Sequence, residues 1–228
     1  MESQSFLIDG NNGDSQVITS SKEYENKQIL LKSKFIGKYL VYFTAAFVSV
    51  GTLLFGYSQG VMASIIVTPQ FKLYFNDPSP HDISIIVSIM EIGALISSII
   101  FNNLNYVGID IGGRRHMIRL GSLIFIVGGF LQFTAINKLQ LILSRLIIGF
   151  AIGILSSNVT IYLSEISHSG SRGLIGSVQF VSNIIGYSTS IWTNYMSTAV
   201  FTGITNNWSW RFPFLFQLFF GILLLIGT

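Results

Sequence analysis

The sequence of 228 residues contains no cysteine, four prolines and few charged residues, which make up only 10% of the chain. The absence of cysteine excludes disulfide bonds and thiolate metal sites. Soluble globular domains carry about 25% charged residues, so a chain with 10% charged and 50% hydrophobic residues does not fit that class. The net charge of +3 comes from basic residues scattered between apolar runs, which argues against a nucleic-acid partner.

Long apolar runs follow a polar start. Residues 1–36 are rich in Ser, Asn, Lys and Glu, and we expect a disordered cytoplasmic tail because they cannot bury enough apolar surface to fold. A helix needs about 20 apolar residues to cross a bilayer. Residues 37–228 are therefore predicted to form an all-α membrane domain with six transmembrane helices, at 37–66, 83–104, 117–136, 139–163, 174–198 and 212–228. Pro213 suits the opening turn of the last helix.

Basic residues gather in alternate gaps between the predicted helices. Cytoplasmic loops of membrane proteins carry an excess of Lys and Arg. The five lysines from Lys22 to Lys38 fall on the same side as Arg114, Arg115, Arg119 and Arg172, whereas Lys72, Lys138 and Arg211 fall on the other. The pattern predicts a multi-pass membrane protein with its amino terminus in the cytoplasm.

Two predicted helices carry polar residues at helical spacing. Within a bilayer, a polar face turns toward protein or a water-filled cavity. The second and fifth helices are therefore expected to be interior, with the third and sixth facing lipid. Such stripes can instead cement helix packing, and both interpretations stay open. The stripes consist of Ser88, Glu91, Ser98 and Asn102 in the second helix, and of Gln179, Asn183, Gly186, Ser190 and Asn194 in the fifth.

Two charged residues, Glu91 and Arg145, are predicted to lie inside the membrane. An ionised group at mid-membrane costs about 2.5–3.5 kcal/mol on insertion scales, so we expect a partner or water beside each. Gly149 and Gly153 follow Arg145 at four-residue steps and would let another helix approach closely. The alternative for Arg145 is that its side chain extends to the outer interface.

Several short motifs occur together at the helix ends, and with them the chain resembles a known family. The motifs are Leu54-Phe55-Gly56-Tyr57-Ser58-Gln59-Gly60, Asp110-Ile111-Gly112-Gly113-Arg114-Arg115, Arg145-Leu146-Ile147-Ile148-Gly149, Tyr162-Leu163-Ser164-Glu165, Gly176-Ser177-Val178-Gln179 and Trp210-Arg211-Phe212-Pro213. Over residues 37–228 the chain is similar to the amino-terminal half of a sugar porter of the major facilitator superfamily, most like the fungal hexose-transporter branch. The resemblance implies one half of a major facilitator fold, transport of a monosaccharide such as a hexose by alternating access, and a plasma-membrane location.

The resemblance also implies site residues. Gln179 would hydrogen-bond the sugar hydroxyls, with Asn183 one turn further on, and Phe55 would pack on the sugar ring. An amide both donates and accepts hydrogen bonds, which suits a polyol. A cytoplasmic charge network that holds one conformation shut would comprise Asp110, Arg114, Arg115, Glu165 and Arg172. A positive-inside anchor explains the two adjacent arginines equally well, but not Asp110 and Glu165.

Coupling to protons is put in doubt by Ser58. Family members that couple sugar to protons carry an aspartate at this position, and a serine cannot exchange a proton near neutral pH. Ser58 therefore favours facilitative transport, and the predicted coupling position consists of Ser58, Arg145 and Glu91. Sugar/proton symport remains an alternative if Glu91 substitutes for the missing acid.

The expected partners are a small-molecule sugar, the lipid bilayer and a second, carboxyl-terminal six-helix half from the same gene or another chain, because the family encloses its substrate between two halves. No cofactor is expected. An enzyme is not expected either, since no His/Asp/Glu cluster, nucleophile elbow or phosphate loop occurs. A transporter-like sugar sensor and a nonfunctional truncated transporter fragment remain alternatives.

Overall fold

The computed structural model describes residues 43–106, 113–166, 172–201 and 207–227. Residues 44–228 form one compact unit, to which all of the described helices belong. The tail predicted at residues 1–36 lies outside the described residues.

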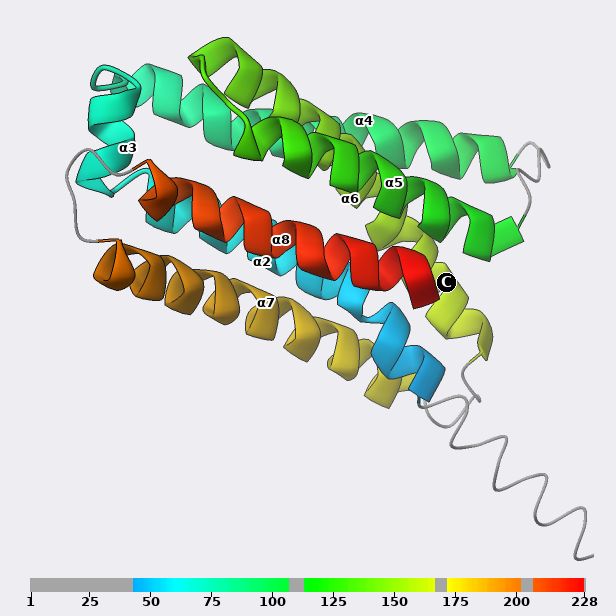
Figure 1. Cartoon of the computed structure of the whole chain (residues 1–228). Helices are drawn as coiled ribbons and strands as arrows, with labels where there is room; N and C mark the ends of the chain where they lie inside the picture. The colour runs from blue at the N-terminus through cyan, green and yellow to red at the C-terminus, as the bar shows by residue number, and fades with distance from the viewer. Residues whose placement is uncertain (1–42, 107–112, 167–171, 202–206, 228) are drawn as a thin grey trace, which may run out of the picture. The chain divides into compact units, whose positions relative to one another are not determined.

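The regular structure in the described residues is helical (Figure 1). A short helix, α3, connects α2 to α4, and the other connections are brief. A serine, Ser79, precedes α4 and a proline occupies its first position, a common way for a helix to begin. The helices are α2 (Val50–Ile65), α3 (Pro69–Tyr74), α4 (Pro80–Tyr106), α5 (Gly113–Phe133), α6 (Lys138–Ile166), α7 (Arg172–Val200) and α8 (Trp208–Gly227).

Five helical segments in the described residues are long and apolar enough to cross a bilayer, and they confirm the predicted all-α membrane class. The remaining prediction, a span at 174–198, corresponds to α7. This helix has 29 residues and is long enough to cross a bilayer, but it is less apolar than the five segments. Its amide and hydroxyl side chains lower its hydropathy although its exposed face carries large apolar residues such as Phe180 and Trp192. The five segments are Phe43–Ile65, Pro80–Phe101, Arg115–Phe133, Lys138–Glu165 and Trp208–Gly227.

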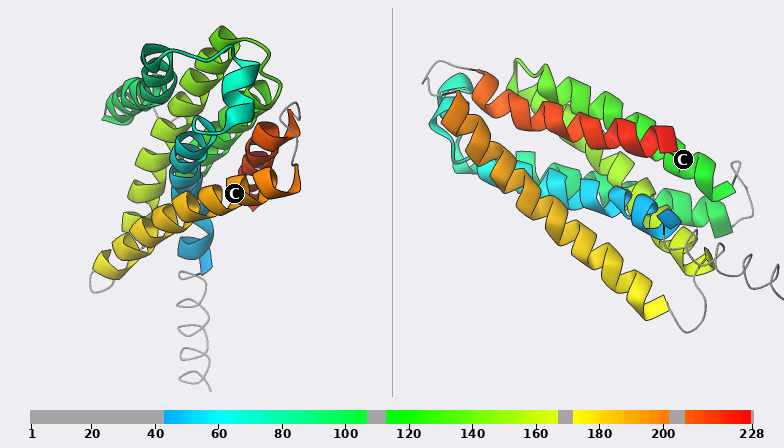
Figure 2. Two further views of the ribbon diagram at one scale, coloured as in Figure 1. Left: turned by 90° about the vertical axis from the view of Figure 1, so that its left-hand side faces the viewer. Right: turned by 60° about the horizontal axis from the view of Figure 1, so that its bottom comes forward.

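The long helices pack in two groups of three, one of α4, α5 and α6 and the other of α2, α7 and α8 (Figures 1 and 2). Contacts between α5 and α8 and between α2 and α6 join the groups. The helices α2 and α6 are the most enclosed spans, whereas α4 is the least enclosed. The second and fifth spans, α4 and α7, turn large apolar residues such as Ile96 and Ile184 outward in this unit. Their interior position stays a prediction, because it concerns a transporter completed by the expected second half.

Glycines bring two helix pairs into backbone contact. A Cβ on Gly56 of α2 would collide with the carbonyl oxygen of Asn183 on α7, and a Cβ on Gly149 of α6 would collide with that of Met90 on α4. The two contacts are equivalent. Gly149 follows Gly56 by 93 residues, and Asn183 follows Met90 by the same 93 residues. Close approach of this kind requires a residue without a side chain.

The same offset relates the rest of both interfaces. Gly60 and Gly153 face the carbonyl oxygens of Tyr187 and Ala94, and Gly186 and Gly93 face those of Leu53 and Leu146. The unit therefore consists of two structural repeats, α2–α4–α5 and α6–α7–α8, whose first helices have exchanged places: α2 packs on α7, and α6 packs on α4.

Most of the polar stripe on α7 is a packing surface. Ser190, Asn194 and Ser197 are buried, and Gly186 touches the backbone of α2. The packing interpretation of this stripe is thus correct for the half of α7 that follows Gly186. Only Gln179 and Asn183, nearer the start of the helix, stay half-exposed.

Helix α8 starts earlier than predicted, at Trp208, so that Pro213 lies inside the helix rather than in its opening turn. A proline has no N–H to offer the carbonyl four residues before it. The freed carbonyl of Ser209 accepts a hydrogen bond of 2.6 Å from Ser197 Oγ of α7, and the carbonyl of Pro213 accepts one of 2.9 Å from Tyr57 of α2. These bonds tie α8 to α7 and α2, the other two helices of its group.

The short helix α3 is held against the start of α8 by aromatic residues. Trp210 is fully buried, and its ring lies 5.1 Å from that of Tyr74 and 5.6 Å from that of Phe75. The Arg211 guanidinium lies over the Trp210 ring at 5.0 Å and donates to the Tyr74 hydroxyl at 3.3 Å. Cation–π contacts of this kind stabilise by about 0.5–2 kcal/mol.

Candidate functional site

Polar side chains from four helices form two clusters within the unit. The first, here named the Arg145 cluster, comprises Ser58 and Gln59 of α2, Met90 and Glu91 of α4, and Arg145 of α6. The second, the Gln179 cluster, comprises Thr52 of α2, Thr160 of α6, and Gln179 and Asn183 of α7.

Arg145 is buried within its cluster, with 1% of its surface exposed. Its Nη1 donates to the Ser58 carbonyl at 3.0 Å and to the Met90 sulfur at 3.1 Å. Among the described residues, its Nε and Nη2 have no hydrogen-bond partner. The alternative that Arg145 extends to the membrane interface is therefore wrong, since the side chain turns into the protein.

Glu91 and Gln59 sit beside this buried cation. Gln59 Nε2 donates to Glu91 Oε1 at 2.9 Å, and the Glu91 carboxylate interacts favourably with the charge of Arg145. Glu91 is exposed, so its carboxylate remains accessible. Ser58 is fully buried, and its hydroxyl oxygen has no partner among the described residues. The structure thus brings together all three residues of the predicted coupling position.

The Gln179 cluster joins α7 to two neighbouring helices. Asn183 Nδ2 donates to the Thr52 carbonyl at 3.3 Å, and the Thr52 hydroxyl lies 3.4 Å from the Gln179 carbonyl. The Gln179 side chain reaches α6, with Nε2 3.5 Å from Thr160 Oγ1. Two of these contacts are at the long end of the hydrogen-bond range, so a ligand could replace them at little cost. Thr52 and Thr160 were not identified from the sequence, because only the fold brings them to Gln179.

Phe55 lies on α2, one turn after Thr52, and is half-buried against the apolar core. The described contacts therefore leave part of its ring uncovered, as packing on a ligand requires. The close approach of α2 and α7 at Gly56 places Phe55 next to the residue that touches Asn183. Gln179 and Asn183 thus meet α2 at one helix interface, whereas Phe55 packs against a core cluster that α2 forms with α4, α5, α6 and α8.

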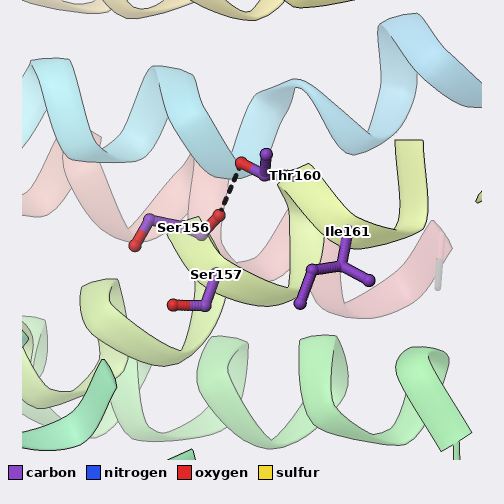
Figure 3. Close-up of a pocket in the computed structure, with 4 residues that line it drawn as sticks. All are labelled: Ser156, Ser157, Thr160 and Ile161. Carbon is purple, nitrogen blue, oxygen red and sulfur yellow. Dashed lines mark hydrogen bonds between the residues drawn. The ribbon is translucent and has the colours of Figure 1, made fainter. Parts of the chain in front are cut away.

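A shallow cavity of about 330 Å³, widely open to the surface, lies on α6 and is lined by four residues of that helix, Ser156, Ser157, Thr160 and Ile161 (Figure 3). Thr160 belongs to both this cavity and the Gln179 cluster. The sequence offered one signal for it, the run of hydroxyl residues before Tyr162, which was not interpreted as a site.

The predicted charge network can be followed only in part. Glu165 lies in the last turn of α6 and Arg115 in the first turns of α5, and both are exposed. Arg114 and Arg172 lie at the starts of α5 and α7, and their side chains, like the whole of Asp110, lie outside the described residues.

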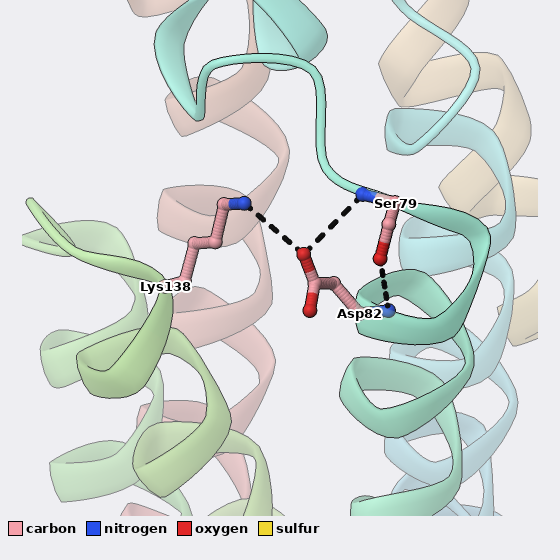
Figure 4. Close-up of polar contacts among 3 residues, drawn as sticks. All are labelled: Ser79, Asp82 and Lys138. Carbon is pink, nitrogen blue, oxygen red and sulfur yellow. Dashed lines mark hydrogen bonds and ion pairs between the residues drawn. The ribbon is translucent and has the colours of Figure 1, made fainter.

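An ion pair at the opposite end of the helices was not predicted. Lys138 Nζ, at the start of α6, lies 3.1 Å from Asp82 Oδ2 in the first turn of α4 (Figure 4). Asp82 also accepts from the Ser79 backbone at 3.3 Å, while the Ser79 hydroxyl accepts from the Asp82 backbone at 3.2 Å. This reciprocal pattern is a helix-capping arrangement, whose sequence signal is Ser79-Pro80-His81-Asp82.

No group of three or more His, Asp or Glu side chains that could hold a metal ion occurs in the described part of the chain. Both clusters instead offer hydrogen-bonding groups from several helices. Such groups can donate hydrogen bonds to a polar molecule and accept them from it.

Comparison with known proteins agrees with this character. A family model described as "Sugar (and other) transporter" matches residues 44–228. The chain is 32% identical over 193 residues to the MFS-type transporter criB of Aspergillus cristatus, and the alignment covers 85% of this chain and 40% of that protein. It is 31% identical over 173 residues to the glucose transporter GlcP of Staphylococcus epidermidis, and the alignment covers 76% of this chain and 35% of that protein.

A solved structure shows the same fold. It is that of the E. coli proton:xylose symporter XylE bound to 6-bromo-6-deoxy-D-glucose. The superposition covers 84% of this chain and 44% of the XylE chain, with a TM-score of 0.68 and 20% identity. The chain thus spans less than half the length of each of these proteins, consistent with the amino-terminal half of a major facilitator fold. These relatives are transporters, not enzymes. The chain belongs to the sugar transporter family of the major facilitator superfamily.

Proposed function

We propose that the protein carries a hexose across a membrane by alternating access and without proton coupling. The observation that supports this most directly is the Gln179 cluster, in which two amides on consecutive turns of α7 meet hydroxyl and carbonyl groups of α2 and α6. The cluster contains no charged side chain, so its hydrogen-bonding groups suit a neutral polyol better than an ionic solute. The half-exposed ring of Phe55 would pack on the apolar face of the sugar.

Facilitative transport is supported by Ser58, which is buried against Arg145 and has no group that exchanges a proton near neutral pH. A second candidate is sugar/proton symport through Glu91. It is favoured by the contact between Glu91 and Gln59 and by the unpaired N–H groups of Arg145 within the described residues, which a carboxylate could approach.

The chain is proposed to work with a second six-helix half, because it covers 40% of criB and 35% of GlcP. We place it in the plasma membrane with a cytoplasmic amino terminus. The end of the helices that carries Glu165 and Arg115 would then be the inner mouth. Ion pairs among Asp110, Arg114, Arg115, Glu165 and Arg172 would have to break when this mouth opens, and so would bias the two-state motion.

The test is uptake of radiolabelled glucose by a cell that lacks its own hexose transporters and expresses this chain, with and without a supplied carboxyl-terminal half. We expect Gln179→Ala to lower uptake about tenfold or more, because it removes an amide that donates and accepts. Gln70→Ala, which removes the same group from α3, should leave uptake unchanged. Equal uptake by the two variants would remove Gln179 from the sugar site.

A further inference from the structure

The cavity on α6 has an unusual lining for an apolar helix. Three of its four lining residues, Ser156, Ser157 and Thr160, present hydroxyl groups, and the fourth is Ile161 (Figure 3). We call the three the hydroxyl cluster. None of the lining residues is charged, so a ligand held here would be neutral.

The hydroxyls of the cluster are not equivalent. The Ser156 hydroxyl donates to the Gly153 carbonyl at 3.3 Å, and the Thr160 hydroxyl donates to the Ser156 carbonyl at 2.8 Å. Ser and Thr in helices commonly use their protons in this way, and their oxygens can still accept. The Ser157 hydroxyl has no hydrogen bond to any described residue, so it can both donate and accept.

The hydroxyl cluster adjoins the Gln179 cluster. Gln179 Nε2 lies 3.5 Å from Thr160 Oγ1, which places the amide of α7 at the edge of the α6 cavity. That contact is long, and Thr160 is exposed, so one ligand hydroxyl could bond to both side chains in its place. The two helices together then offer an amide, two acceptor oxygens and one hydroxyl that is free to donate.

From this arrangement we propose that the hydroxyl cluster is a second wall of the sugar site, which binds two neighbouring hydroxyl groups of a pyranose or linear polyol. Gln179 and Thr160 contact one of them, and Ser157 contacts the other. Ile161 covers adjacent carbon atoms of the ligand. This inference deepens the proposed sugar transport and rests on it, and it adds Ser157 and Thr160 as residues that select among sugars.

The test measures equilibrium binding of glucose and of its 2-, 3-, 4- and 6-deoxy analogues to the chain in lipid nanodiscs, co-expressed with a carboxyl-terminal half. Ser157→Ala should weaken glucose binding about 3- to 10-fold, the effect of one lost hydrogen bond. For one deoxy analogue, Ser157→Ala and the unsubstituted chain should have the same affinity, because that analogue lacks the hydroxyl that contacts Ser157. Ser157→Thr keeps the hydroxyl and should restore glucose binding.

A control variant and the pattern of affinities over the five sugars separate recognition from folding. Ser84→Ala removes an exposed serine hydroxyl of α4 and should change no affinity. A Ser157→Ala variant that loses affinity equally for all five sugars would overturn the proposal, because a structural effect does not distinguish them. So would unchanged glucose binding in both Ser157→Ala and Thr160→Val, even with Gln179→Ala inactive. Failure of the unsubstituted chain to bind any hexose would overturn the proposed function as well.

Discussion

The amide of Gln59 on α2 donates a 2.9 Å hydrogen bond to the carboxylate of Glu91 on α4. Their neighbours in sequence, Ser58 and Met90, both accept hydrogen bonds from Arg145 of α6. Three helices therefore meet around one carboxylate and one buried guanidinium. Removing either charge should affect the other residue as well as the helix contacts.

A double-mutant cycle should detect this coupling. Glu91→Gln leaves the buried cation without the carboxylate that offsets its charge and should be destabilising, whereas Arg145→Met removes the need for that carboxylate. We expect the effects of the two changes to differ from additivity by about 0.5–2 kcal/mol. Thermal unfolding of the four proteins in detergent measures the difference. Arg115→Met, which removes an exposed arginine on α5, is the control partner, and additivity in both cycles would show that Glu91 and Arg145 act independently.

The glycines at the two equivalent helix crossings should tolerate no side chain. Gly56→Ala and Gly149→Ala would each drive a methyl group into a backbone carbonyl of the facing helix, and we expect each to cost about 1–3 kcal/mol of stability. Gly173→Ala and Gly176→Ala, on the first turns of α7, meet no atom within 4 Å. They should be neutral or stabilising, because alanine favours a helix. Unfolding of all four variants under the same conditions makes the comparison, and equal losses would contradict the role of close approach.

The sequence was enough to predict the six long helices, because membrane spans depend on local composition, but not the short helix α3. It also indicated Gln179, Asn183, Glu91 and Arg145 as candidate site residues, since a polar or charged residue in an apolar run stands out against its neighbours. The direction in which each polar stripe faces was harder. On α7, Ser190 and Asn194 face protein and only Gln179 and Asn183 reach the half-exposed region, a difference that depends on where α2 crosses.

The structural repeat was missed for a related reason. Its main sequence signal is a set of glycines such as Gly56 and Gly149, and single glycines are too common in membrane helices to stand out. The partners Thr52 and Thr160 were missed because they join Gln179 only through contacts between helices distant in sequence. The predicted start of α8 is too late, because a proline favours the first turn of a helix and Pro213 suggested that position. The helix instead continues through Pro213, since Ser197 of α7 donates to the Ser209 carbonyl that the proline leaves without a partner.

The ion pair between Asp82 and Lys138 should make a small, salt-dependent contribution to stability. Both side chains are 38% exposed, and exposed pairs are weak and screened by salt. Lys138→Met should therefore lower the unfolding temperature slightly at low ionic strength and not at about 1 M salt, where the screening length is about 3 Å. Lys72→Met, which changes an exposed lysine of α3, should show no such salt dependence. A loss that persists at high salt would mean that Lys138 acts through packing.

The absence of an acid at position 58 provides the sharpest test of facilitative transport. Because Arg145 already donates to the Ser58 carbonyl, the carboxylate introduced by Ser58→Asp would lie close to a guanidinium with two N–H groups unpaired among the described residues. Such a group can take up a proton on the acidic side of the membrane and release it on the other. We expect the unsubstituted transporter to equilibrate glucose regardless of the proton gradient, and Ser58→Asp to accumulate glucose when the outside is acidic. A protonophore should abolish that accumulation.

The control is Ser58→Asn, which has nearly the same size as Ser58→Asp and cannot exchange a proton. Identical pH profiles for the two variants would show that coupling requires more than an acid at this position. Protonophore-sensitive accumulation by the unsubstituted protein would instead assign coupling to Glu91.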